Sequence, residues 1–173
     1  LEQTLFSLLG LARLHASTEP PAVEAIDLTD TIAAAVDAMP VPVRDRVHID
    51  IAPGTPLVAS NAVMLHHITM NLIDNAAKYS PPDSAIGVCV TEDGAGGAIL
   101  SVVDAGTGLG DNAQDLFGLF RRGRNADSAP GSGVGLAVVD AFARALGHGV
   151  TVSNRADGQG SVFAVTMTGW PRT

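Results

Sequence analysis

Cysteine, aromatic side chains and positive charge are all scarce in this chain of 173 residues. Cys89 is the only cysteine, which excludes an internal disulfide and a zinc site built from several cysteines, and fits a reducing compartment. Aromatic residues make up 4% of the chain against an apolar fraction of 46%, which predicts a core built from Val, Ile, Leu and Ala.

The negative charge and the short apolar runs exclude further classes. A formal charge of −8 gives no general attraction to nucleic acid or to an anionic membrane surface, so an anionic ligand must meet local basic residues, backbone amides or a metal ion. No apolar run reaches membrane-spanning length, because Asp74 and Lys78 interrupt one candidate and Asp140 and Arg144 interrupt the other. The first residues also lack the pattern of a cleavable targeting segment.

The expected elements alternate in the order of an α+β domain. Helices are predicted at 1–16, 27–38, 60–80 and 134–146, and strands at 47–51, 57–59, 85–91, 98–104, 150–153 and 161–166. Residues 17–25 form a proline-containing linker and residues 169–173 a C-terminal tail. This order predicts a two-layer sandwich, with a mostly antiparallel sheet covered by helices on one face.

The helix at 60–80 carries an apolar stripe. Leu65, Ile68, Leu72 and Ala76 recur at helical spacing, so one side of this helix faces the core. Ser60 is expected to cap its N-terminus.

A polar cluster lies beside that stripe. At about 100° per residue, Asn71, Asn75 and Lys78 share a face about a quarter turn away from the apolar one. Amide oxygens can ligate Mg²⁺, and a lysine can neutralise phosphate charge, so the face suits a metal-bound polyphosphate. Taken alone, it also fits a solvated polar helix surface.

A first glycine-rich segment, at 104–110, directly follows an expected strand. Asp104 at the strand end can accept a hydrogen bond from an exocyclic amine such as that of adenine. Gly106 and Gly108 let the backbone approach a flat ring without a Cβ in the way. Taken alone, the segment fits an ordinary Asp-Gly loop equally well.

A second glycine-rich segment, at 131–136, precedes an expected helix and exposes backbone N–H groups where phosphate is well placed. No strand leads directly into it and no parallel βαβ unit surrounds it, so the dinucleotide-binding interpretation fails. Between the two segments, residues 105–131 form a long loop rich in glycine and arginine, of the kind that is usually functional.

In combination, these segments resemble the catalytic and ATP-binding domain of sensor histidine kinases, in the superfamily shared with gyrase, the Hsp90 chaperones and the MutL proteins. The N box corresponds to 71–80, the first glycine box to 104–110, the F box to 116–120 and the second glycine box to 131–136. The resemblance covers 26–168, and residues 1–16 look like the end of the second dimerisation helix.

The resemblance implies the Bergerat fold, in which ATP and Mg²⁺ lie between the N-box helix and a flexible lid at 105–131. It also implies that the γ-phosphoryl group passes to a histidine on a dimerisation helix and then to a response regulator. The full-length protein would be a homodimer through its dimerisation helices. The domain itself would be cytoplasmic, part of a membrane-bound sensor, and would contact neither nucleic acid nor membrane.

Each box implies roles for individual residues. In the N box, Asn75 would ligate Mg²⁺, Asn71 and Lys78 would contact metal or phosphates, and Tyr79 would lie near the phosphates or ribose. Asn71, Asn75 and Lys78 are therefore expected to be catalytic.

In the glycine boxes, the resemblance assigns the adenine amino group to Asp104, the flat face of the base to Gly106 and Gly108, and the phosphates to Gly133 and Gly135. Further nucleotide-binding positions that the boxes imply are Gly110, Gly131 and Leu136.

In the F box, Phe117 and Phe120 would anchor the lid by burying their rings, with Phe120 close to the nucleotide. Arg121 or Arg122 would reach the γ-phosphate as a catalytic group, although both also fit solvated lid charges. Gly118 departs from the family, where an acidic residue is frequent at this position of the F box.

Asn71 separates two activities within the superfamily. The ATP-hydrolysing relatives place a water-activating glutamate four residues before the metal-binding asparagine, and Asn71 stands at that position. A carboxamide is a poor general base, so the sequence favours phosphoryl transfer over hydrolysis.

The phosphoacceptor pattern of the family, a histidine followed by an acidic residue, is absent. His15 precedes Ala-Ser, His66 and His67 lie in the nucleotide-site helix, and His48 and His148 are predicted as strand and turn residues. His67, one turn before Asn71, fits either a group near the site or a packed helix residue. We expect the acceptor helix to lie outside this sequence.

Two other functions fit the same fold. One is a serine kinase acting on an anti-sigma antagonist, against which the N-terminal helix argues. The other is a degenerate domain used for docking or phosphotransfer, against which the retained nucleotide boxes argue.

Overall fold

A five-stranded sheet in the order β2-β4-β5-β7-β6 forms one layer of the computed structural model, which describes residue 12 and residues 19–109 and 134–171. Its strands are β2 (Val47–Ile51), β4 (Ile86–Glu92), β5 (Ala98–Val103), β6 (Gly149–Asn154) and β7 (Ser161–Met167). Only β2 and β4 pair in parallel, while the other neighbours are antiparallel. The predicted, mostly antiparallel sheet is therefore confirmed.

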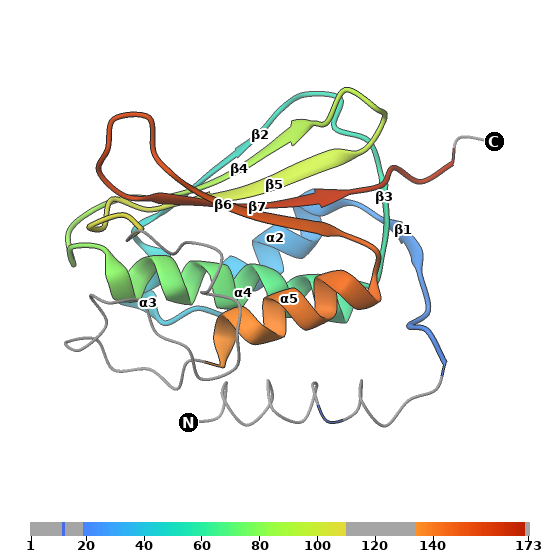
Figure 1. Ribbon diagram of the computed structural model, residues 1–173, viewed down its shortest axis with the longest axis horizontal. Helices are drawn as coiled ribbons and strands as arrows, with labels where there is room; N and C mark the ends of the chain where they lie inside the picture. The colour runs from blue at the N-terminus through green and yellow to red at the C-terminus, as the bar shows by residue number, and fades with distance from the viewer. Residues whose placement is uncertain (1–11, 13–18, 110–133, 172–173) are drawn as a thin grey trace.

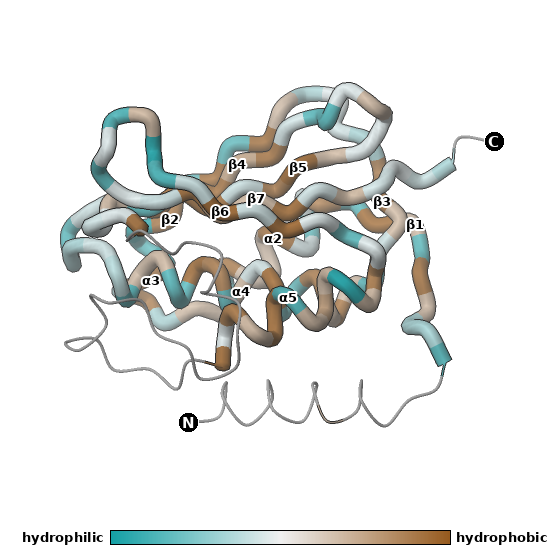
Figure 2. The backbone as a smooth tube through the Cα atoms, in the orientation of Figure 1, coloured by the Kyte–Doolittle hydropathy of each residue, from teal (hydrophilic) through white to brown (hydrophobic). Residues whose placement is uncertain are grey.

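Helices cover one face of this sheet (Figure 1). They are α2 (Leu28–Asp37), α4 (Ala62–Tyr79) and α5 (Gly135–Ala145), with the single turn α3 (Val41–Arg44) beside them. Figure 2 shows apolar stretches along β4, β5 and β7 and polar residues at the β6–β7 turn, and buried residues of these three strands belong to the core. The two-layer α+β sandwich expected from the element order is confirmed.

The apolar stripe of α4 faces the core as predicted. Leu65, Ile68, Leu72 and Ala76 are each no more than 1% exposed. Complete burial of one large aliphatic side chain contributes about 1.5–3 kcal/mol, so this stripe fixes which side of α4 faces the sheet.

The predicted cap of α4 is wrong by one residue. Asn61 is the N-cap, and its side-chain oxygen accepts a hydrogen bond from the backbone N–H of Met64 at 3.1 Å. Ser60 instead ends a strand and is fully buried, with its hydroxyl 2.9 Å from Nε2 of His148. The hydroxyl of Ser60 thus contacts the distant His148, and the cap is supplied by Asn61.

Strand β2 is confirmed. Its residues alternate between apolar and polar, which predicts one buried and one exposed face, but its burial does not follow this pattern. His48, Ile49 and Asp50 are all exposed, and only Val47 and Ile51 pack against the core. The ends of β2 are thus covered, while its middle, including Ile49, is exposed.

A second, two-stranded sheet pairs β1 (Glu24–Ile26) with β3 (Val58–Ser60). The expected strand at 57–59 thus exists, although outside the main sheet. Strand β1 lies where the sequence predicts the end of the 17–25 linker, and Gly169 at the start of the predicted tail forms a bridge with Val58. Unlike the continuous apolar run at 57–59, the three residues of β1 include Glu24 and show no apolar pattern that predicts a strand.

Helix α3 was not predicted from the sequence, because prolines stand at its N-terminus. Pro40 precedes this helix and Pro42 lies in its first turn, where a proline needs no N–H partner.

Among the described helices, none has both the length and the hydropathy required to cross a bilayer.

Candidate functional site

Asp104 lies at the end of the main sheet where β5 ends and β7 begins, and it is only 3% exposed. Its Oδ1 accepts hydrogen bonds from the backbone N–H groups of Gly106 at 2.8 Å and Ser161 at 3.3 Å. Its Oδ2 accepts a short hydrogen bond from the Ser161 hydroxyl. A carboxylate offers about four lone-pair positions, so this buried group retains capacity for one further donor.

Ser161, which orients that carboxylate, was missed by the sequence analysis. It begins β7, 57 positions along the chain from Asp104, and its backbone carbonyl also accepts the N–H of Asp104 at 3.0 Å. Only the pairing of β5 with β7 brings the two residues together. No local pattern could have identified this contact.

The described parts of both glycine-rich segments contact α4. A Cβ on Gly106 would lie 2.3 Å from the backbone oxygen of Tyr79, a distance that no side chain tolerates. A Cβ on Gly135 would lie 3.0 Å from Oδ1 of Asn71, which is tighter than ordinary van der Waals contact. The structure therefore brings together the N box and described parts of both glycine boxes, as the sequence predicts.

The polar face of α4 changes from buried to exposed towards its C-terminus. Asn71 is 6% exposed, and its Nδ2 donates to the backbone oxygen of His67 at 2.8 Å. Asn75 is half-buried, and its carboxamide has no hydrogen-bond partner among the described residues. Lys78 is exposed and forms an ion pair with Asp74, one turn earlier. The three predicted N-box residues thus lie on one face but differ in accessibility.

Tyr79, the last residue of α4, is 38% exposed at this end of the sheet. Leu136, expected near the nucleotide, is partly buried against the hydrophobic core at the start of α5. Gly108 lies in the loop after β5 with a φ of +75°, a conformation that glycine adopts without strain.

Arg46 holds the C-terminal end of α4, and the sequence analysis assigned it no role. Its guanidinium donates to the backbone oxygens of Ser84 at 2.8 Å and Pro81 at 2.9 Å, and to the hydroxyl of Ser80 at 2.7 Å. A weaker contact of 3.4 Å reaches the backbone oxygen of Ala77 inside the helix. A cation is favoured at a helix C-terminus, where carbonyl groups lack partners.

His67 packs between helices. Its ring centroid lies 6.2 Å from that of Phe142 in α5, in an edge-on arrangement. Burial, and to a lesser extent His66, lowers the pKa of His67. Of the two interpretations left open for His67, the packed helix residue agrees with this contact.

Several predicted site residues lie outside the described residues, and their contacts stay predictions. These are Gly110, Phe117, Phe120, Arg121, Arg122, Gly131 and Gly133.

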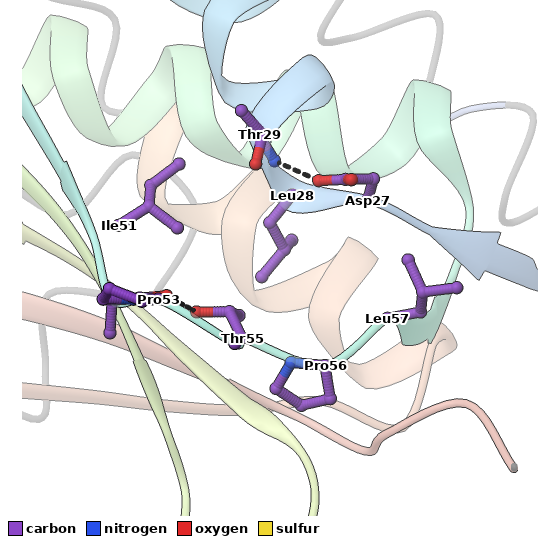
Figure 3. Close-up of a pocket in the computed structure, with 10 residues that line it drawn as sticks. Asp27, Leu28, Thr29, Ile51, Pro53, Thr55, Pro56 and Leu57 are labelled. Carbon is purple, nitrogen blue, oxygen red and sulfur yellow. Dashed lines mark hydrogen bonds between the residues drawn. The ribbon is translucent and has the colours of Figure 1, made fainter.

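A separate hollow of about 370 Å³ lies between the start of α2 and the loop from β2 to β3 (Figure 3). Strand β2 runs parallel to β4, and its first residue pairs with Ile86, the first residue of β4 after α4. Ile51, at the other end of β2, therefore lies at the far end of the sheet, opposite the end that carries Asp104. Pro53, Pro56 and Leu57 line this hollow. It contains none of the predicted site residues.

Residues 60–169, more than half of the chain, match the family described as histidine kinase-, DNA gyrase B-, and HSP90-like ATPase. The chain belongs to this family. The predicted superfamily is thereby confirmed, and membership in an ATPase family carries with it the binding of ATP.

Curated relatives of the chain within this family are sensor kinases. The signal transduction histidine-protein kinase/phosphatase MprB of Mycolicibacterium vanbaalenii is 35% identical over 132 residues, which cover 74% of this chain and 27% of MprB. Sensor protein KdpD of Escherichia coli strain K12 is 27% identical over 162 residues, which cover 93% of this chain and 18% of KdpD. The chain thus spans about a quarter or less of these relatives.

Solved histidine kinase structures share the fold. The mycobacterial sensor histidine kinase MprB superposes with a TM-score of 0.71 at 27% identity, over 87% of this chain and 99% of that one. Full-length ShkA in complex with AMPPNP gives a TM-score of 0.76 over 96% of this chain and 35% of ShkA. At 23% identity, the ShkA match supports the fold alone.

Proposed function

We propose that this chain is the catalytic domain of a two-component sensor histidine kinase, which transfers the γ-phosphoryl group of ATP to a histidine on a dimerisation helix. The observation that carries the proposal is the arrangement at Asn71. In a chain of this ATPase family, a carboxamide faces Gly135 at the position where the hydrolysing relatives carry a glutamate. Without a carboxylate to activate water, the bound nucleotide is kept for a positioned acceptor.

Adenine binding falls to Asp104 in this proposal. Its buried carboxylate is held by Ser161 and Gly106 and keeps acceptor capacity for an exocyclic amine. A site built to hydrogen-bond one group rejects ligands that lack the group, because the buried partner is then left unpaired. Gly106 and Gly108 leave room for a flat ring beside the carboxylate.

Magnesium fits the carboxamide of Asn75. This side chain is partly exposed and has no partner among the described residues, so one hard oxygen ligand is available. In proteins, Mg²⁺ commonly binds one or two side chains and completes its shell with water and phosphate oxygens. The metal would supply charge neutralisation, while the chain supplies orientation through Asn71 and Lys78.

The proposed partners follow from the kinship with sensor kinases. They are the phosphoacceptor helix of the same protein, a second protomer that forms the helical dimer, and a response regulator that receives the phosphoryl group. A cytoplasmic location, as part of a membrane-bound sensor, belongs to the same proposal.

Calorimetric titration with Mg-ATP tests nucleotide binding. We expect saturable binding by the native chain, a strong loss in Asp104→Ala and Asn75→Ala, and no loss in the control Asp50→Ala, which removes an exposed carboxylate from β2. Absence of binding by the native chain, or unchanged binding in both site variants, refutes the proposal.

A transfer assay then tests the acceptor. The chain is incubated with labelled ATP and a separate protein that carries a family acceptor helix. We expect an acid-labile phosphohistidine on that protein and none on the chain itself. An acid-stable phosphoserine would support the serine kinase instead, and binding without transfer would support a docking module.

A further inference from the structure

The last residue pair of the β6–β7 ladder joins Asn154 to Ser161, and both side chains reach the first glycine segment. Ser161 donates to the carboxylate of Asp104. On the neighbouring strand, Oδ1 of Asn154 accepts a hydrogen bond from the backbone N–H of Leu109 at 2.6 Å. One end of this hairpin therefore holds both the start and the end of the segment.

Close packing accompanies the Asn154 hydrogen bond. A Cβ on Gly108 would lie 2.8 Å from Oδ1 of Asn154 and 3.4 Å from the backbone oxygen of Gly160. Gly108 also has a positive φ of 75°, so its conformation and its surroundings both require glycine. Leu109 packs its side chain against the core while its N–H points to Asn154.

Two side-chain acceptors thus fix the backbone between residues 106 and 109. Asp104 holds the N–H of Gly106 at the first position, and Asn154 holds the N–H of Leu109 at the last. A short glycine-containing segment gains much conformational freedom when such contacts are lost, and a ligand must then restrict that freedom on binding.

We propose that Asn154 is a positioning residue for adenine recognition, because it holds Gly108 and Leu109 in the conformation that lines the base. The inference rests on the proposed function. Asn154 belongs to none of the nucleotide boxes, and its contact lies at the base segment rather than on the polar face of α4. Its removal therefore weakens the binding of the base, with the phosphates playing no part.

Binding of adenosine and of Mg-ATP to the full chain tests the proposal. One hydrogen bond is worth about 0.5–1.5 kcal/mol, so we expect Asn154→Ala to weaken both ligands by the same factor of about 3 to 10. Asn154→Asp keeps an acceptor for the Leu109 N–H and should restore adenosine affinity to within about twofold. The control Ser153→Ala changes the adjacent exposed residue of β6 and should bind both ligands as the native chain does.

Hydrogen exchange at the amide of Leu109 provides a second readout. We expect faster exchange in Asn154→Ala and native exchange in Asn154→Asp, with little change in melting temperature, since the contact is exposed. A purely structural role would lower the melting temperature without the paired loss of affinity.

Two results overturn the inference. One is native adenosine affinity in Asn154→Ala, whether or not the affinity for Mg-ATP falls. The other is equal weakness of the Ala and Asp variants for adenosine. Failure of the native chain to bind any adenine ligand has a different meaning, because it removes the proposed function and the inference with it.

Discussion

The two ends of the main sheet differ in how far apart along the chain their side-chain hydrogen-bond partners lie. At the end that carries Asp104, hydrogen bonds and glycine contacts connect segments that are far apart in the chain, such as β7 with the loop after β5. At the far end, the hollow of Figure 3 is roomy, but its side-chain hydrogen bonds are local: the N–H of Thr29 donates to Oδ1 of Asp27, and the hydroxyl of Thr55 donates to the backbone oxygen of Ala52. Convergence of distant polar groups, rather than the size of a hollow, therefore identifies the functional end.

Matched Asp→Asn substitutions at the two ends test this contrast most strongly. Asp104→Asn puts an amide NH₂ among donors that need an acceptor, and hydrogen bonds to a charged group contribute about 1.5–3 kcal/mol, so we expect adenosine affinity to fall about 10- to 100-fold. Asp27→Asn should leave affinity and stability unchanged, because asparagine caps a helix as well as aspartate does. Calorimetry and thermal melting measure both. Equal losses at the two ends would contradict the contrast.

Matched glycine substitutions come next in size. Gly106→Ala introduces a Cβ 2.3 Å from the Tyr79 oxygen, and we expect the crowding to lower the free energy of unfolding by about 1–3 kcal/mol and to abolish tight nucleotide binding. Gly54→Ala, in the far hollow, meets no atom within 4 Å and has only its φ of +81° to accommodate, at about 1 kcal/mol. Urea unfolding gives both values. A larger cost at Gly54 would show that backbone conformation outweighs crowding.

The pH dependence of the free energy of unfolding tests the buried contact between the hydroxyl of Ser60 and Nε2 of His148. Burial lowers the pKa of His148, so the unfolded chain binds this proton more readily than the folded chain does. Stability from this group is complete above the unfolded pKa of about 6.5 and is lost as the pH falls below it. We expect a smaller loss between about pH 7.5 and pH 5.5 in His148→Gln than in the native chain.

Part of that slope should persist in the variant, since the pKa of His67 is lowered as well. The control Thr151→Ser changes an exposed residue of β6 that does not ionise and should leave the slope unchanged. Urea unfolding at each pH gives the slopes. An identical slope in His148→Gln and the native chain would show that Ser60 and His148 do not contribute to the pH dependence.

Regular periodicity explains which parts of this fold are predictable from sequence. The apolar stripe of α4 repeats over several turns, and it predicts both the helix and its buried side. The small strand β1 and the turn α3 are too short to carry a period. The exposure of Ile49 in β2 depends on which strands the helices cover, and no local pattern encodes that.

Residues of the site are likewise predictable from sequence only where they belong to a motif. Asp104, Gly106 and Asn71 belong to ordered motifs, so the sequence alone indicates them. Ser161 and Asn154 enter only through strand pairing, because their partners lie 57 and 45 positions away. Arg46 is hidden for the same reason, since the carbonyl groups that it binds belong to the end of α4 and the following turn.

The smallest expected effect is at Leu57, which lines the far hollow and is 46% exposed. Leu57→Ser removes apolar surface that is already half in water, so we expect a change of no more than about 0.5 kcal/mol in the free energy of unfolding and none in adenosine affinity. Val58→Ser, one residue later and fully buried, is the matched comparison and should cost several times more. If Leu57→Ser weakened adenosine binding and Val58→Ser did not, the far hollow would be coupled to the nucleotide end. The two ends of the sheet would then form one functional unit.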